Sequence, residues 1–254
     1  MTEQTTLCDK YKPECFADVK GQEQAIEKVK IFFKNFPKKK ALILQGATGT
    51  GKPSLAYALA SETNSEILEL NASDLRNREQ ISKIIGEAIK QKSLFSKSKI
   101  LLVDEIDGIT KDDRGGLPEL ISLIQETSFP IILTSNDIWD RKFSDLRRKA
   151  ELVQLEELDY KIILEILKKI AGKENIKLDE NILKSIAIKA GGDARAALND
   201  LQTITLETGQ EDIGERDKEE SIFNALKQVL KGLPNHETLY LYDRVALSLD
   251  EIFL

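Results

Sequence analysis

The chain has 254 residues, 41% of them hydrophobic, with 37 basic and 43 acidic side chains and a formal net charge of −6. This length suits two modest domains better than one large one, and with this acidic balance any contact with DNA must come from a local basic face or from neighbouring subunits. No apolar run reaches the roughly 18–20 residues of a membrane helix, and the first residues lack the basic and apolar stretches of a secretory signal, so we expect a cytoplasmic protein without a membrane partner.

Cys8 and Cys15 are the only cysteines, and His236 is the only histidine. Two cysteines are too few for a disulfide framework or a four-ligand zinc site. A single histidine argues against metal or triad chemistry based on histidine. The sequence assigns no role to these three residues.

Residues 1–155 alternate short apolar runs with longer amphipathic segments. Near-continuous apolar strands that alternate with helices are typical of a parallel sheet covered by helices on both faces. We therefore predict an α/β domain over 1–155. Its strands are expected at Ala41–Leu44, Glu66–Leu70, Ile100–Val103 and Pro130–Thr134, and its helices at Ser54–Glu62, Gln80–Lys90 and Leu117–Gln125.

The character of the sequence changes after Glu156, where helical periodicity continues with no strand-like run. Asp159 and Asp179 stand where N-caps belong, and a glycine pair at 191–192 separates two helical segments. This predicts a small all-helical domain over 156–210, then a solvated, charge-rich loop and the beginning of a further helical domain over 221–254. The three helices of the small domain are expected at Tyr160–Ala171, Glu180–Ala190 and Ala194–Thr205.

The segment GATGTGK, residues 46–52, follows the first expected strand and opens the first helix. Its glycines allow backbone N–H groups to face phosphate oxygens, the helix N-terminus adds a positive dipole, and Lys52 can reach the terminal phosphates. This context predicts a phosphate-binding loop. Pro53 stands where such a loop normally has the Ser or Thr that binds magnesium, and Ser54 would point about 100° away from that position. The residues expected at the nucleotide phosphates are Gly46, Ala47, Thr48, Gly49, Thr50, Gly51, Lys52, Pro53 and Ser54.

Polar residues also follow the later strands. An acidic pair at the end of a strand is usually a solvated turn, but beside a phosphate loop it predicts a site for a metal and a water, with Asp104 near magnesium and Glu105 as the base for the attacking water. Asn136 ends the fourth strand, where its amide could orient that water. Arg195 opens the third helix of the small domain; such an arginine is normally a surface residue, so its role depends on the rest of the pattern.

Several motifs together resemble the AAA+ ATPases, and in particular the large subunits of archaeal replication factor C, the sliding-clamp loader. The resemblance extends over essentially the whole chain. The small subunits of this family carry a Ser-Arg-Cys arginine finger, which the corresponding stretch 146–150 lacks. The motifs that carry the resemblance are KYKP at 10–13, DVKGQ at 18–22, ELNASD at 69–74, DRGG at 113–116, and TSND at 134–137 with Trp139 and Asp140.

The resemblance implies a fold, cofactors and partners. It implies an AAA+ domain with a helical lid and the start of a helical collar, ATP and Mg²⁺ as cofactors, Tyr11 and Val19 at an adenine pocket, Asn136 as sensor 1 and Arg195 as sensor 2. It also implies a heteropentamer with replication factor C small subunits arranged as a spiral around primer–template DNA, in which ATP binding lets the spiral open the sliding clamp and hydrolysis releases it. Sequence-independent DNA phosphate contacts are expected at Arg76, Arg78, Lys83 and Arg114.

The chain departs from the family pattern at several positions. The usual tryptophan near the N-terminus is absent, Ala47 and Thr48 replace a proline pair, and Pro53 replaces the magnesium-binding hydroxyl. The family's large subunit continues through a complete collar and a C-terminal tail that often binds the clamp, so we expect either a split gene or a fragment. Two alternatives stay open beside the ATP-driven subunit: a structural subunit with impaired nucleotide chemistry, favoured by Pro53, and another AAA+ DNA-processing motor, disfavoured by the DRGG motif.

Overall fold

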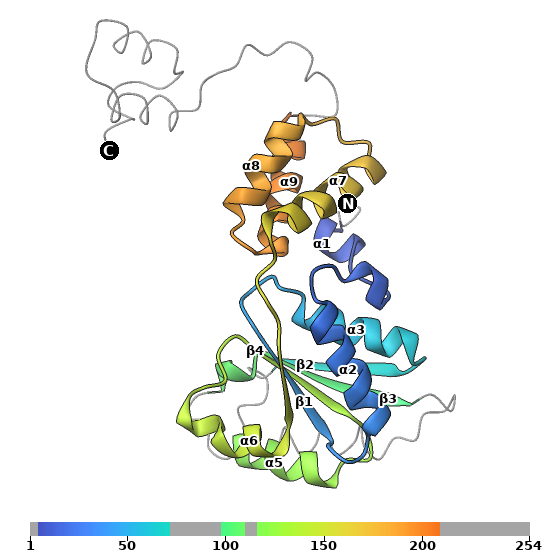
Figure 1. The fold of residues 1–254 in the computed structure, drawn as a ribbon, viewed down its shortest axis with the longest axis vertical. Coiled ribbons are helices and arrows are strands. Elements are labelled where there is room, and N and C mark those ends of the chain that lie inside the picture. The colour runs from blue at the N-terminus through green and yellow to red at the C-terminus, as the bar shows by residue number, and fades with distance from the viewer. Residues whose placement is uncertain (1–4, 72–97, 110–115, 209–254) are drawn as a thin grey trace, which may run out of the picture. The chain divides into compact units, whose positions relative to one another are not determined.

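A computed structural model describes residues 5–71, 98–109 and 116–208 (Figure 1). Residues 1–207 form one compact unit, which holds the sheet and the helices that surround it. Several predictions lie outside the described residues. These are the helix at Gln80–Lys90, the helical domain over 221–254, and the DNA contacts at Arg76, Arg78, Lys83 and Arg114.

Five parallel strands form one sheet in the order β2-β3-β4-β1-β5. The register pairs Leu44 of β1 with Thr134 of β4, and Asn71 of β2 with Asp104 of β3, so the carboxyl ends of these strands lie at the same end of the sheet. The predicted parallel sheet is therefore confirmed. Its strands are β1 (Ala41–Gln45), β2 (Glu66–Asn71), β3 (Lys99–Asp104), β4 (Ile131–Ser135) and β5 (Glu151–Gln154).

Strand β5 and helix α2 (Glu23–Asn35) are not among the predicted elements. β5 lies at the edge of the sheet, where it pairs with β1 alone, and Val153 is the buried residue among its four. An edge strand with one buried side chain leaves no apolar run in the sequence to indicate it. Helix α2 buries Ala25, Val29 and Phe32, a spacing of three and four that is typical of an amphipathic helix.

Both faces of the sheet are covered by helices, because successive residues of a strand point to opposite faces. In β1, Leu42 and Leu44 join an apolar cluster with α2 and α3, whereas Ala41 and Ile43 join a second cluster with α5 and α6. Figure 1 shows these two pairs of helices on either side of the strands. The helices are α3 (Lys52–Glu62), α5 (Gly116–Glu126) and α6 (Ser144–Lys149).

Three helices follow the sheet and form the lid. Asp159 and Asp179 cap the first two, because their side chains accept hydrogen bonds from Lys161 N at 2.8 Å and Asn181 N at 2.9 Å. The lid core is an apolar cluster to which all three helices contribute, and Ile163 is a fully buried member of it. The predicted helical lid is thus confirmed, with helices α7 (Tyr160–Lys173), α8 (Glu180–Lys189) and α9 (Ala194–Thr208).

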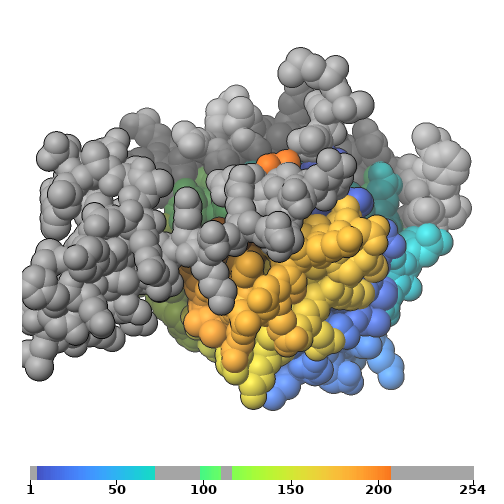
Figure 2. Space-filling model, turned by 90° about the horizontal axis from the view of Figure 1, so that it is seen from above, coloured from blue at the N-terminus to red at the C-terminus, as the bar shows by residue number. Residues whose placement is uncertain are grey.

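The N-terminal helix α1 (Leu7–Lys10) packs against the lid, although the chain then returns to the sheet domain (Figure 1). The backbone N–H of Leu7 donates to Gln202 Oε1 of α9 at 2.9 Å. Figure 2 looks at the molecule from above, with the atoms of the lid in yellow and orange. None of the helices in the described part of the chain is long and apolar enough to cross a membrane.

Candidate functional site

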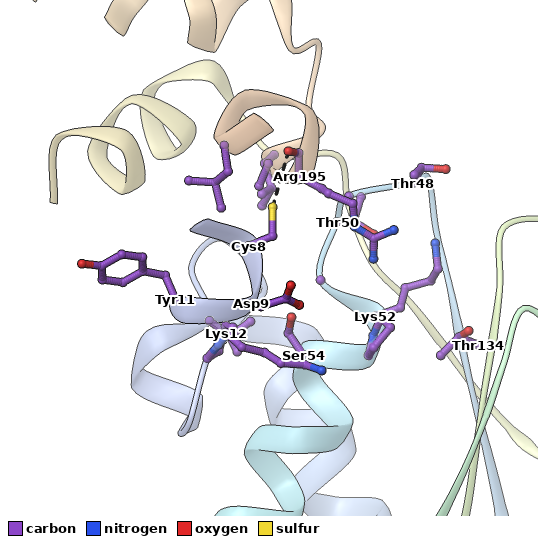
Figure 3. A pocket seen from close by; sticks show the side chains of 18 of the residues that line it. Cys8, Asp9, Tyr11, Lys12, Thr48, Thr50, Lys52, Ser54, Thr134 and Arg195 are labelled. Atoms are coloured by element: carbon purple, nitrogen blue, oxygen red, sulfur yellow. Dashed lines mark hydrogen bonds between the residues drawn. The ribbon is translucent and has the colours of Figure 1, made fainter. Parts of the chain in front are cut away.

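A cavity of about 490 Å³ lies between the carboxyl end of the sheet and the lid. This volume is in the range of ordinary small-molecule sites, roughly 300–1,000 Å³. It is lined by the N-terminal segment between Thr6 and Lys20, by the loops after β1, β3 and β4, and by helices α7 and α9 of the lid. Figure 3 shows the cavity with residues from each side.

The loop between β1 and α3 has the backbone geometry of a phosphate cradle. Gly49 and Gly51 have φ angles of 72° and 93°, in the left-handed region that favours glycine. Gly51 is the N-cap of α3 and offers no capping side chain, so the first N–H groups of this helix, which have no partner within it, open into the cavity. Thr50 Oγ1 closes the loop by donating to Ala47 O at 2.8 Å.

Lys52 is buried, with 7% of its surface exposed, and its ammonium is held by three acceptors. It donates to Gly46 O and Ala47 O, each at 2.8 Å, and to Asn136 Oδ1 at 2.7 Å. Burial lowers the pKa of Lys52, while the Asp107 and Asp104 carboxylates act in the opposite direction. Gly46 and Ala47 themselves do not line the cavity. Their carbonyls instead hold the side chain of Lys52, which does line it.

Pro53 is the second residue of α3 and lines the cavity. Proline is accepted in the first turn of a helix because the N–H groups there have no intrahelical partner and its fixed φ suits the helix. It brings neither an N–H nor a hydroxyl to the cavity wall. Ser54, the next residue, also lines the cavity (Figure 3).

The carboxyl ends of β3 and β4 are joined through Thr134, which is fully buried. Its hydroxyl donates to Asp104 Oδ1 and accepts a hydrogen bond from Glu105 N at 3.0 Å. Glu105 has φ 56° and ψ 47°, a left-handed conformation that is uncommon for a residue with a side chain. Such backbone strain costs about 1–3 kcal/mol and is found mainly at functional sites. Both Asp104 and Glu105 line the cavity, and Glu105 is exposed there.

Asn136 follows β4 and is held on both sides. Its side-chain oxygen accepts from Lys52, as described, and its Nδ2 donates to Asp107 Oδ2 at 3.2 Å. Its backbone N–H donates to Asp107 Oδ1, also at 3.2 Å. Asp107 is a residue that the motif analysis missed. The available signal is its position three residues after Asp104, in the same loop at the end of β3.

Gln22 is a second missed residue, and it connects the phosphate loop to the start of the lid. Its side chain is 3% exposed and makes three hydrogen bonds. Nε2 donates to Thr50 O at 3.3 Å and to Glu156 O at 2.7 Å, while Oε1 accepts from Glu156 N at 3.2 Å. The Gly-Gln pair at 21–22 was the signal in the sequence, but the partners become visible only in the fold.

The first turn of α9 rests on the phosphate loop. Ala194 N donates to Gly49 O at 3.3 Å, and Asp193 Oδ1 caps the helix by accepting from Ala196 N at 2.9 Å. The contact is so close that a Cβ added to Gly49 would lie 1.8 Å from Asp193 Oδ1. Arg195 follows directly and lines the cavity, and Figure 3 shows its side chain extending toward Thr48 and Lys52.

The N-terminal segment forms the remaining wall. Val19 is buried and lines the cavity, as does Tyr11, whose ring points away from the phosphate loop and whose hydroxyl donates to Glu174 of the lid. Cys8 also lines the cavity, donates to Asn199 Oδ1 at 3.4 Å, and has its thiol pKa raised by burial. Both cysteines are free thiols, and Cys15 donates to Asp18 Oδ2 at 3.3 Å.

The structure thus brings the described site candidates to one cavity, with Gly46 and Ala47 directly behind it. Residues 42–157 match the family model "ATPase family associated with various cellular activities (AAA)", and residues 165–206 match the "RCF1/5-like, AAA+ ATPase lid domain". The chain carries an AAA ATPase domain followed by a lid of this type. The α/β part is called the AAA domain below.

Three curated proteins, all replication factor C large subunits, are similar in sequence to most of this chain. The replication factor C large subunit of Nanoarchaeum equitans is 44% identical, covering 96% of this chain and 59% of the relative. The large subunits of Methanococcus maripaludis (strain C7) and Thermofilum pendens are 40% and 39% identical, covering 88% and 87% of this chain. The chain is a relative of archaeal replication factor C large subunits, and it spans 48% and 57% of the length of these last two.

Proposed function

We propose that the chain is an ATP-driven clamp-loader subunit that binds Mg-ATP in this cavity and uses binding and hydrolysis to load a sliding clamp onto primer–template DNA. The observation that carries the proposal is the convergence of four separate segments on one cavity. The phosphate loop, the acids after β3, the amide of Asn136 and the guanidinium of Arg195 all line it. Each has a distinct task in nucleotide chemistry.

The cavity has the charges and surfaces that ATP needs. The free N–H groups at the start of α3, the Lys52 ammonium and the Arg195 guanidinium suit the phosphates. Apolar side chains of the N-terminal segment and the lid suit the adenine ring: Val19, Leu158, Ile170 and Leu198 line the cavity there. Tyr11 belongs to the same wall, anchored by its hydroxyl to the lid.

Magnesium would have Asp104 as its protein ligand. The described residues contain no group of three or more His, Cys, Asp or Glu side chains that could hold a metal by themselves. Mg²⁺ is commonly bound by one or two carboxylates together with substrate phosphates, so a single carboxylate beside a phosphate loop fits. Bound there, the ion would neutralise charge on the phosphates. Pro53 withholds the second protein oxygen that the position normally supplies.

Hydrolysis needs a base, and Glu105 is placed to serve as one. Its backbone is left-handed and its N–H donates to Thr134, and the residue is exposed and lines the cavity, which supports this role. A carboxylate there can accept the proton of an attacking water. Asn136 orients that water, and Arg195 reaches the charge on the phosphates from the lid side.

The partners are proposed from the resemblance of the sequence motifs to clamp loaders, and the relatives' name supports only the association with other replication factor C subunits. We propose assembly with replication factor C small subunits into a heteropentamer, action on a sliding clamp, and sequence-independent contact with primer–template DNA, in the cytoplasm. The candidate DNA contacts Arg76, Arg78, Lys83 and Arg114 remain predictions. A basic residue that contacts DNA phosphate should make binding depend on salt, and its removal should weaken that dependence.

A second candidate function is a structural subunit that holds the assembly together without productive ATP chemistry. Pro53 is the observation that favours it, since both a backbone N–H and a hydroxyl are missing at a position on the cavity wall. The two candidates differ in turnover, not in fold.

Binding of a fluorescent ATP analogue to the full chain, with magnesium present, tests the proposal. Lys52→Ala should abolish binding, because it removes the ammonium aimed at the terminal phosphates. Lys40→Ala is the matched control. Lys40 directly precedes the first residue of β1, at the end of the strand opposite the phosphate loop, where its Nζ donates to Gln125 O, so this variant should bind like the wild type. Unchanged affinity in Lys52→Ala would sink the phosphate-loop assignment.

Turnover separates the two candidates. It should be measured on the wild-type chain mixed with small subunits, sliding clamp and primed DNA, against the same mixture with Lys52→Ala. A drop in turnover with the variant supports the ATP-driven subunit. Equal turnover, with assembly intact, supports the structural subunit.

A further inference from the structure

Asp107 grips one residue of the cavity with both of its carboxylate oxygens. It lies in the short helix η3 (Ile106–Gly108), directly after the acids that end β3. Oδ1 accepts from the backbone N–H of Asn136 and Oδ2 accepts from its side-chain Nδ2, each at 3.2 Å. The two bonds fix both the position of the loop after β4 and the direction of the Asn136 amide.

The direction of that amide is set by its two charged neighbours. A carboxylate can only accept hydrogen bonds and an ammonium can only donate them. The Nδ2 group of Asn136 must therefore face Asp107, and its Oδ1 must face Lys52, where it accepts at 2.7 Å. A flipped amide would place Nδ2 against the ammonium and Oδ1 against the carboxylate. Asp107 and Lys52 together leave one arrangement.

This arrangement leaves the amide equipped for a further task. A side-chain amide has two N–H groups and two acceptor lone pairs, and the bonds to Asp107 and Lys52 use one of each. The second N–H group is the one that can meet a phosphate oxygen or a water in the cavity, which Asn136 lines. Its aim depends on the bonds that hold the amide.

We propose that Asp107 is a positioning residue of the nucleotide site, which acts through Asn136 to aim both the amide and the Lys52 ammonium at the nucleotide. The consequence for turnover rests on the proposed ATP function, whereas the contact itself does not. Asp107 has no hydrogen bond to Lys52, so its effect on the lysine passes through the amide and through its charge.

The charges around Lys52 agree with this role. Burial lowers the pKa of the lysine, and Asp107 is the strongest of the nearby carboxylates that oppose it, ahead of Asp104 and Glu105. The positive charge of Arg195 lowers the pKa of Lys52, as burial does. Asp107 thus supports the charged form of the lysine as well as its geometry.

A double-mutant cycle on turnover tests the positioning role. Asp107→Ala and Asn136→Ala should each lower kcat/KM by about 10-fold or more, the value of a hydrogen bond to a charged group. The double variant should lose much less than the product of the two single losses, because Asp107 acts mainly through Asn136 and only its charge acts on Lys52 without that residue. Losses that multiply would overturn the proposal.

Asp137→Ala is the matched control for the kinetics. Asp137 lies in the same loop, and its Oδ1 accepts from Trp139 N at 2.8 Å, so it holds the loop without touching the Asn136 amide. It should retain near wild-type turnover. Equal losses in Asp107→Ala and Asp137→Ala would reduce Asp107 to a loop-stabilising residue and overturn the proposal.

A spectroscopic measurement on the nucleotide-free full chain makes the test independent of ATP. The side-chain amide signal of Asn136 in a ¹⁵N–¹H spectrum is assigned by its loss in Asn136→Ala. Asp107→Ala should shift this signal and speed its exchange with solvent, while Asp137→Ala should leave it in place. An unmoved signal overturns the proposal.

The spectrum also shows whether each variant is folded. If Asp107→Ala unfolds the chain, Asp107→Asn keeps the shape of the side chain and one acceptor oxygen, and carries the same tests. A wild-type chain that fails to bind ATP while the amide signal responds to Asp107 overturns the proposed function alone.

Discussion

The two walls of the cavity that face the lid differ in how their residues are held. The strand-end wall, made of Asp104, Glu105, Asp107, Thr134 and Asn136, is held by hydrogen bonds of its own side chains, two of them to another side chain and two to a backbone N–H of the wall. The loop wall, formed by the loop at residues 46–54, depends mainly on backbone geometry: it has two left-handed glycines and the start of α3, and its carbonyls accept hydrogen bonds from Thr50 and Lys52 of the same loop.

This difference explains why the loop wall tolerates a departure that the strand-end wall would not. Pro53 satisfies the backbone geometry of its position in the first turn of α3, so the loop folds although a hydroxyl and an N–H are missing. A change at Thr134 would remove the hydrogen bonds of Asp104 and of the Glu105 N–H, and a change at Asn136 would remove a hydrogen bond of Asp107. At position 53 the loop wall therefore lacks chemical groups without a cost to the fold, whereas at Thr134 and Asn136 the groups that line the cavity also hold the strand-end wall together.

Glu105→Gln is expected to have the largest effect, and it concerns the strand-end wall. The amide cannot accept the proton of the attacking water, and positioned acid–base catalysis is worth about 10²–10⁴-fold, so turnover should fall by that range. ATP affinity should stay near wild type, since the side chain keeps its shape. Steady-state turnover and nucleotide binding on the same preparation check both parts.

Glu66→Gln, at the exposed start of β2, is the matched control because it lies at the opposite end of the sheet. It should change neither quantity. If turnover survives Glu105→Gln, Glu105 is not the base. The strand-end wall would then have no demonstrated part in the chemical step.

Pro53→Thr is expected to have a smaller effect, in the favourable direction. It restores an N–H for phosphate and a hydroxyl for magnesium. A hydrogen bond to a charged group is worth roughly 1.5–3 kcal/mol, so Mg-ATP affinity should rise by about 10- to 150-fold, and turnover should rise as well. Titrations with and without magnesium measure this.

Pro53→Ala separates the two restored groups, because it returns the N–H without the hydroxyl. It should recover the part of the affinity that does not depend on magnesium. If neither variant changes affinity or turnover, position 53 is neutral for nucleotide chemistry. The two walls would then differ only in how they are held.

Gln22→Ala is expected to have the smallest effect on the nucleotide, but a clear effect on stability. It leaves the buried Thr50 O and both backbone groups of Glu156 without their partner. An unsatisfied buried group costs about 1–3 kcal/mol, and this applies to Thr50 O, whereas Glu156 is exposed and water can replace its bonds, so we expect a loss of about 2 kcal/mol in the free energy of unfolding. Urea denaturation of the full chain measures it.

Gln24→Ala on the same helix is the control, because Gln24 is exposed and its loss should stay within about 0.5 kcal/mol. Equal stability of the two variants would show that the loop wall is maintained by its backbone alone, without the side chain of Gln22.

The sequence predicted the parts of this molecule that repeat a local pattern. Apolar runs identify the three interior strands β1, β3 and β4 as well as the edge strand β2, and Asp159 and Asp179 identify helix starts, because strand patterns and helix capping are read within a few residues. The phosphate loop, the acids after β3 and Arg195 were each indicated by motif, and the fold adds that all of them line one cavity.

The contacts that sequence reasoning missed join residues far apart in the chain. Asp107 and Asn136 are 29 residues apart, and Gln22 and Glu156 are 134 residues apart. Neither pair has a periodicity that a local window could detect. β5 was missed for the related reason that its strand character comes from pairing with β1 rather than from its own four residues.

The placement of α1 restricts how the lid can move. The lid is joined to the AAA domain directly, through residues 155–159, and a second time through the N-terminal segment. That segment is fastened to the lid by Leu7 and to the AAA domain by Phe16, whose N–H donates to Glu62 Oε1 at 3.0 Å. The first turn of α9 makes a further contact, through Ala194 N and Gly49 O. A ligand in the cavity would thus meet a lid that is tied to the AAA domain on more than one side, so any displacement of Arg195 must also strain the N-terminal segment.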